Sequence, residues 1–322
     1  MNIVAVDLGG THARFAIAAL HGDRRPTLSQ PRKYRTADNA SLADAWAAFA
    51  RDEGGVLPDA ASIAIAGPVD GELIRFTNNS WAIRPATLAR ELGVDHLRLF
   101  NDFAAMAAAV GVLADDELAY VGGPEGPLPA EGVTTVIGPG TGLGVAQLLR
   151  RDGRAIVLAT EGGHIDFAAL DGFEESLLGR LRERHRRVSV ERIVSGPGLA
   201  DIRSTLALLG NQPIVPMDDA TVWAAAIEGK DRIAAQALDR FVMAFGAVTG
   251  DLALAQGANA VVITGGLAQR IEDRLRGPLF NDRFRAKGRF EHRMATFPIR
   301  LARHPEAGLL GAAAAFQEDQ NR

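Results

Sequence analysis

The chain has 322 residues, a length that suits about two domains or one large one. Its 35 basic and 39 acidic residues give a formal charge of -4, too small an imbalance to predict a nucleic acid or a membrane surface as partner. Cysteine is absent, which excludes disulfides, thiolate catalysis and cysteine-ligated metal centres. The hydrophobic and charged fractions, 47% and 23%, are typical of a folded globular protein.

The N-terminal residues lack the basic, apolar and cleavage regions of a secretory signal. The longest uninterrupted apolar run, residues 104–114, is about half of the ~20 residues that a membrane-spanning helix needs. We therefore expect a cytoplasmic protein without a transmembrane helix.

The first third of the chain alternates predicted strands with predicted helices. Strands are expected at residues 3–6, 13–20, 62–66 and 97–100, and helices at 41–51, 85–92 and 103–110. The first two strands flank a Gly9-Gly10 turn, and the last strand ends at Asn101-Asp102. This alternation predicts α/β architecture with functional groups at the carboxyl ends of strands.

The remainder of the chain repeats this order. Dense glycine and proline at residues 121–129 predict a loop near a domain boundary. A strand at 134–137, a glycine turn at 138–144 and a strand at 145–149 follow, which suggests two related halves. A late strand at 260–263 stops before Gly265-Gly266, and a helix is expected at 309–316.

Three strand-end glycine turns therefore carry the functional signal. Glycine lets backbone N–H groups approach phosphate oxygens because no Cβ intervenes. Residues 138–144 do not match the dinucleotide fingerprint, and the only Gly-Lys pair, Gly229-Lys230, precedes Asp231 rather than the hydroxyl residue of a P-loop. Each turn alone is weak evidence for phosphate binding. An ordered set of three such turns, with Asp7 at the end of the first strand, is much stronger evidence.

This set resembles the superfamily of actin, hexokinase and sugar kinases, an actin-like ATPase fold of two α/β domains, ribonuclease H-like, with an interdomain cleft. By that resemblance Asp7 would hold Mg²⁺ through water. The turns would contact ATP: phosphates at Gly9, Gly10, Thr11, Gly140, Thr141 and Gly142, and adenosine at Gly265 and Gly266.

Within that superfamily the sequence is similar to bacterial glucokinases that lack the ROK zinc motif. The resemblance runs through nearly the whole chain and rests on six short motifs at residues 7–14, 76–81, 101–103, 140–145, 161–164 and 191–199. His12 departs from the Asn that this family often has, which affects the contact expected at the first phosphate turn.

Asp102 is the candidate general base. Phosphorylation of a hydroxyl needs a group that accepts its proton. The residues alone leave Asp102 open between that role and a helix N-cap, for which Asp is a favoured residue. The resemblance implies the catalytic role.

A sugar pocket needs carboxylates and amides that converge on several hydroxyls. The resemblance assigns this role to Asn78, Asn101, Asp102, Glu161, His164 and Glu191. Glu161 and His164 flank Gly162-Gly163, so both side chains can reach one ligand; the same spacing fits a metal site, but no second such pair occurs. Considered singly, His164 would be a structural histidine, Glu191 a partner of nearby arginines, and Asn78 a turn residue.

Arginines cluster between Arg180 and Arg187, but glutamates surround them and no aromatic residues interleave. We interpret this cluster as a solvated helix face rather than a nucleic-acid site.

The resemblance implies ATP-dependent phosphorylation of glucose to glucose 6-phosphate, the first step of glycolysis, with Mg²⁺ carried by the nucleotide. It also implies a small domain of residues 1–110 plus 303–322, a large domain of 111–302, and a homodimer. Two alternatives stay open: a kinase for another hexose such as fructose or mannose, and a sugar-binding regulator without catalysis. An actin-like filament protein would have no use for the sugar residues.

Overall fold

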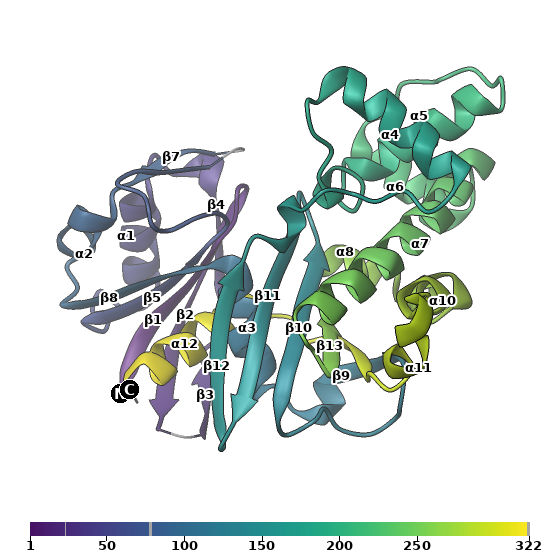
Figure 1. The fold of residues 1–322 in the computed structure, drawn as a ribbon. Coiled ribbons are helices and arrows are strands. Elements are labelled where there is room, and N and C mark those ends of the chain that lie inside the picture. The colour runs from purple at the N-terminus through teal and green to yellow at the C-terminus, as the bar shows by residue number, and fades with distance from the viewer. Residues whose placement is uncertain (23, 77–78, 321–322) are drawn as a thin grey trace. The chain divides into compact units, whose positions relative to one another are not determined.

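The computed structural model describes residues 1–22, 24–76 and 79–320, and the chain forms two compact units (Figure 1). The first unit contains Met1–Ala114, Gly153–Ala159 and His304–Arg322, and the second contains Asp115–Asp152 and Thr160–Arg303.

The first sheet is mixed. Its strand order is β3-β2-β1-β5-β8, with β4 paired to β2. Strands β1 and β2 are antiparallel, whereas β5 runs parallel to both β1 and β8. A separate hairpin joins β6 to β7. The strands are β1 (Asn2–Leu8), β2 (His12–His21), β3 (Arg24–Leu28), β4 (Arg32–Arg35), β5 (Ala60–Ile65), β6 (Ile74–Phe76), β7 (Asn79–Ile83) and β8 (His96–Asn101).

Helices cover both faces of this sheet. They are α1 (Leu42–Asp52), α2 (Pro85–Leu92), α3 (Asp102–Val112) and α12 (Ala307–Gln320). Val4, Val6 and Leu8 belong to the core that α1 and α2 complete, and Ile3 and Ala5 to the core that α3 and α12 complete. Since successive side chains of a strand point to opposite faces, a strand covered on both sides is apolar on both, as β1 is from Ile3 to Val6.

The second sheet has the strand order β12-β11-β10-β13-β14-β9. Its strands are β9 (Leu118–Gly122), β10 (Gly132–Pro139), β11 (Leu143–Arg151), β12 (Arg154–Thr160), β13 (Ala260–Ile263) and β14 (Ile299–Ala302). The helices after β12 are α4 (Gly172–Arg184), α5 (Gly198–Leu209), α6 (Asp219–Glu228), α7 (Arg232–Ala255), α8 (Gly266–Arg270), α9 (Glu272–Leu275), α10 (Pro278–Arg285) and α11 (Glu291–Met294).

Helix α7 is the centre of the second core. The Asp231 side chain begins it by accepting hydrogen bonds from the N–H groups of Ile233 and Ala234. Phe241 and Phe245 of α7 are fully buried, and the Phe245 ring lies 5.4 Å from that of Phe280 in α10 at an edge-to-face angle. This geometry is the favourable one for two aromatic rings.

The repeated order expected from the sequence is confirmed. Strands β1 and β2 form an antiparallel pair around residues 9–11, and β10 and β11 form one around residues 140–142. In each sheet the first strand of the pair also has a parallel neighbour, β5 or β13. The fold therefore brings the carboxyl ends of parallel strands beside each glycine turn.

The loop expected at 121–129 is wrong at its start, because Val121 and Gly122 belong to β9. Gly122 pairs with Ile299 of β14. The buried Arg300 guanidinium donates to the carbonyl oxygens of Gly122, Pro124 and Gly126, so one cation satisfies the strand end and the start of the loop. This long-range pairing overrides the local glycine signal.

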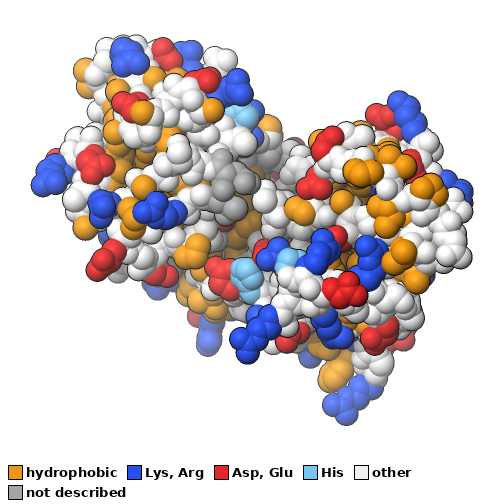
Figure 2. Space-filling view, turned by 90° about the horizontal axis from the view of Figure 1, so that it is seen from above, with side chains coloured by type: hydrophobic (Ala, Val, Ile, Leu, Met, Phe, Trp, Pro, Cys, Tyr) orange, Lys and Arg blue, Asp and Glu red, His pale blue; other side chains and the backbone are white. Residues whose placement is uncertain are grey.

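Within the described part of the chain, no helix is both long and apolar enough to cross a membrane. Basic and acidic side chains are interspersed over the face drawn in Figure 2.

Candidate active site

The first unit contains the glycine turn at residues 9–11, which joins β1 to β2. The Gly9 N–H donates to the carbonyl oxygen of His12 at 3.0 Å and closes the turn. Thr36, the first residue of the short 3₁₀ helix η1 (Thr36–Asp38), makes two hydrogen bonds to this turn. Its N–H donates to the Thr11 carbonyl at 3.1 Å, and its Oγ1 donates to the Gly10 carbonyl at 3.0 Å. The Gly10 and Thr11 carbonyl oxygens therefore already have hydrogen-bond donors. This suits a turn whose N–H groups bind a ligand.

Asp7 is the next-to-last residue of β1, as predicted. Arg14 Nη1 lies 3.2 Å from Asp7 Oδ2, and Gly308 of α12 comes so close that a Cβ built there would lie 2.6 Å from Asp7 Cγ. Burial raises the pKa of Asp7, the Arg14 charge opposes this rise, and the Glu306 charge adds to it. A metal ion beside this carboxylate would favour its ionised form.

Cations gather beside the same turn. In the register of β2 with β4, His12 lies opposite Arg35, and Arg14 lies opposite Lys33. Partial desolvation and the charges of these three cations lower the pKa of His12, so its ring is neutral at pH 7. The positive surroundings favour an anion at the turn.

Asn101, not Asp102, is the N-cap of α3. Asn101 Oδ1 accepts hydrogen bonds from the N–H groups of Phe103 and Ala104, and its Nδ2 donates to the Gly67 carbonyl at 3.2 Å. Asp102 is the first residue of the helix, and its Oδ1 accepts a bond from the Phe103 N–H at 2.9 Å. The capping role that the sequence left open for Asp102 therefore belongs to its neighbour. Asn78 lies outside the described residues.

The second unit contains the other candidate residues. The Gly140 N–H donates to the Gly142 carbonyl at 2.8 Å, and the Gly140 carbonyl accepts from Gly196 at 2.7 Å. Glu191 lies against this turn, because its Oε2 accepts a bond from the Leu143 N–H at 3.2 Å. A Cβ on Gly142 would overlap that oxygen and would lie 3.3 Å from Glu191 Cδ.

Glu161, His164 and Glu191 lie side by side. The His164 ring has Nε2 at 3.7 Å from Glu161 Oε2 and Nδ1 at 3.6 Å from Glu191 Oε1. Two backbone hydrogen bonds bring the segment after His164 beside the segment before Glu191. The Val190 N–H donates to the Ile165 carbonyl, and the Phe167 N–H donates to the Val188 carbonyl. The Glu161 and His164 side chains are more than half exposed, so their polar atoms are available to a ligand.

The third turn lies beside the second. Thr264, after β13, donates its N–H to the Ile137 carbonyl at 2.9 Å, and a Cβ on Gly265 would lie 3.5 Å from the Pro139 carbonyl. Gly265 has a φ of 96°, which L side chains rarely adopt. Gly266 then begins α8. The two predicted nucleotide turns of this unit are thus neighbours.

Sequence reasoning missed several residues that support these groups. These residues are remote in sequence from the groups that they support, so no local motif identifies them. Thr36 bonds to the turn at residues 9–11, Arg35 lies opposite His12, and Gly308 contacts Asp7. The assignment of the arginine cluster to a helix face is wrong for Arg186 and Arg187, because α4 ends at Arg184. Arg187 instead donates hydrogen bonds to the Asp166 carboxylate and the His164 carbonyl, and fixes the backbone that carries His164.

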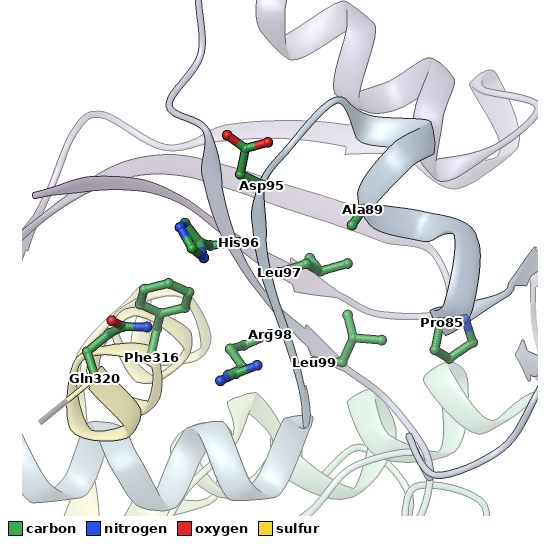
Figure 3. Close-up of a pocket in the computed structure, with 9 residues that line it drawn as sticks. All are labelled: Pro85, Ala89, Asp95, His96, Leu97, Arg98, Leu99, Phe316 and Gln320. Carbon is green, nitrogen blue, oxygen red and sulfur yellow. The ribbon is translucent and has the colours of Figure 1, made fainter. Parts of the chain in front are cut away.

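A pocket elsewhere in the first unit contains none of the candidate residues. It encloses about 370 Å³ between α2, β8 and the end of α12 (Figure 3). Leu97, Leu99 and Phe316 contribute apolar surface, and the Arg98 charge is already paired with Asp319. We assign no chemistry to it. Among the described residues, no group of three or more acidic or histidine side chains forms a metal-binding cluster.

Comparison with known proteins gives a consistent result. A family model described as Glucokinase matches residues 4–319. The glucokinase of Zymomonas mobilis is 52% identical over 316 residues, 98% of each chain, and that of Stenotrophomonas maltophilia is 42% identical over 97% of this chain and 94% of its own. The crystal structure of a glucokinase from an Antarctic psychrotroph, at 31% identity, has a TM-score of 0.84 and covers 98% of both chains.

Proposed function

The chain belongs to the glucokinase family and phosphorylates glucose with ATP, and we propose that Asp102 is the general base of this reaction. The observation that carries the function is the 52% identity to a glucokinase over 98% of both chains. The predicted two-domain actin-like ATPase fold agrees with the similarity to a glucokinase crystal structure.

The role of Asp102 is supported by how α3 begins. Asn101 caps the helix, so the Asp102 carboxylate is not needed for that purpose. We propose that this carboxylate accepts the proton of the glucose 6-hydroxyl as the oxygen attacks the γ-phosphorus of ATP. The oxygen–phosphorus bond then forms while the bond from the γ-phosphorus to the leaving oxygen of ADP breaks. A positioned base contributes typically ~10² to 10⁴-fold to such a step.

Glu161, His164 and Glu191 are proposed to bind the sugar hydroxyls. Carboxylate oxygens accept hydrogen bonds and an imidazole ring presents two nitrogen atoms for them, so this trio matches hydroxyl groups, which are donors and acceptors at once. Asn101 is a weaker candidate because its oxygen and one amide hydrogen already have partners. Asn78 stays a prediction.

The glycine turns are proposed to hold the nucleotide, with Gly9, Gly10, Thr11, Gly140, Thr141 and Gly142 at the phosphates and Gly265 and Gly266 at the adenosine. Mg²⁺ would arrive with ATP. One carboxylate plus substrate phosphates is a common way for proteins to hold this ion, and Asp7 at the strand end fits that pattern. Bound there, Mg²⁺ would neutralise charge on the phosphates.

The homodimer and the domain boundaries at 1–110 plus 303–322 and 111–302 are proposed on the family resemblance, and a cytoplasmic location is proposed as well. Sedimentation velocity of the purified chain tests the dimer, and a monomer at working concentration would refute it.

The test of the proposed function is a coupled assay for sugar phosphate with purified protein, ATP and Mg²⁺. Glucose, fructose and mannose are compared side by side, with a reaction lacking sugar as control. We expect glucose-dependent product and a higher kcat/KM for glucose than for the other two sugars. Higher kcat/KM for fructose or mannose would instead identify the other hexose kinase, and no product with any sugar would contradict the proposal.

A further inference from the structure

Glu191 touches two candidate subsites at once. Its Oε1 faces His164 Nδ1 at 3.6 Å, on the side proposed for the sugar, and its Oε2 accepts the Leu143 N–H at 3.2 Å, at the end of the glycine turn proposed for the phosphates. All these atoms belong to the second unit. Its side chain is only about a quarter exposed.

Gly142 is the point where the turn and the carboxylate meet. A Cβ at this position would overlap Glu191 Oε2, whereas a Cβ on Gly140, two residues earlier in the same turn, would meet nothing within 4 Å. Neither glycine has the left-handed φ that would strain an alanine. The two glycines therefore differ in their contact with Glu191, and neither has a left-handed backbone that would strain an alanine.

We propose that Glu191 is a positioning residue for the phosphate turn as well as a sugar ligand, so that Gly142 determines glucose affinity although it lies in the nucleotide turn. The inference rests on the proposed function, because it takes Glu191 as a residue that binds glucose. A displacement of the Glu191 carboxylate would therefore alter the proposed sugar site and the proposed phosphate turn together.

The first experiment measures the glucose Kd by calorimetry without nucleotide, for wild type, Gly142→Ala and Gly140→Ala. A Cβ at this position displaces the Glu191 carboxylate, so we expect the glucose Kd of Gly142→Ala to rise roughly tenfold or more, which is about 1.4 kcal/mol. That of Gly140→Ala should stay within about twofold. Wild-type glucose affinity in a folded Gly142→Ala would overturn the inference.

The second experiment is the reciprocal one and does not depend on whether Gly142→Ala folds. A non-hydrolysable ATP analogue is titrated without glucose into Glu191→Ala and Glu161→Ala, two variants that each remove a proposed sugar ligand. Of these two residues, Glu191 is the one whose carboxylate accepts the Leu143 N–H in the described structure. Without the Glu191 carboxylate the Leu143 N–H loses its acceptor and the turn is no longer held in place, so the analogue Kd should rise about tenfold or more in Glu191→Ala and stay near wild type in Glu161→Ala.

Equal analogue affinities in the two variants would overturn the inference and leave the proposed function standing. A wild-type chain that bound no glucose would overturn the proposed function itself, and the inference with it.

Discussion

Replacement of Gly308 by alanine should have two opposite effects: it should stabilise helix α12, and it should displace the Asp7 carboxylate. Gly308 lies in the first turn of α12, and alanine is favoured over glycine in helices by about 1 kcal/mol. A Cβ there would lie 2.6 Å from Asp7 Cγ, whereas ordinary contact begins at 3.4 Å, so the carboxylate must move by about 0.8 Å. A displacement of about 1 Å at a reacting centre can cost ~10²-fold in rate.

We therefore expect Gly308→Ala to lower kcat/KM for ATP by ~10 to 10²-fold at saturating glucose, measured by the coupled assay across ATP and Mg²⁺ concentrations. The matched control is Gly179→Ala in α4, because Gly179 is exposed and a Cβ there meets nothing within 4 Å. The control should gain thermal stability and keep its kinetics. Gly308→Ala with wild-type kcat/KM for ATP and raised stability would refute the assignment of Asp7 to the nucleotide site.

Two further predictions concern single side chains. Thr36→Val removes the hydroxyl that donates to the Gly10 carbonyl, so we expect a rise of about tenfold in the KM for ATP, reversed by Thr36→Ser; equal KM values for the two variants would contradict this. Burial raises the pKa of Glu174 above its usual value near 4.5, so the folded protein keeps a proton that the unfolded chain has released. The free energy of unfolding then falls as pH rises through that interval. The Glu174→Gln variant lacks this titration, so its free energy of unfolding relative to wild type should be higher at about pH 7 than at about pH 4. Urea unfolding at the two pH values measures the difference. A difference that does not change with pH would contradict the raised pKa of Glu174.

The sequence predicted the elements that end in functional groups because their signals are local. The strand at 3–6 is a run of apolar residues that stops at Asp7 and a glycine pair, and the structure extends it by only one or two residues at each end. The alanine-rich helix after Asn101 was equally visible. The family resemblance supplied the roles, which no periodicity contains.

Contacts between remote segments could not be predicted in this way. That Gly308 abuts Asp7, or that Glu191 reaches Leu143, depends on tertiary packing across long sequence separations. The choice between Asn101 and Asp102 as the cap of α3 depends on a difference of one residue in where the helix begins. Propensity cannot decide this, because both residues are good caps.

The most direct test of the account is the rate of Asp102→Asn. This variant keeps the size of the side chain and an oxygen that can accept the Phe103 N–H, but it removes the base. We predict a fall in kcat of ~10² to 10⁴-fold for glucose 6-phosphate formation, with the glucose Kd from calorimetry changed by no more than a few-fold. A folded Asp102→Asn protein that turned over glucose at the wild-type rate would contradict the central claim.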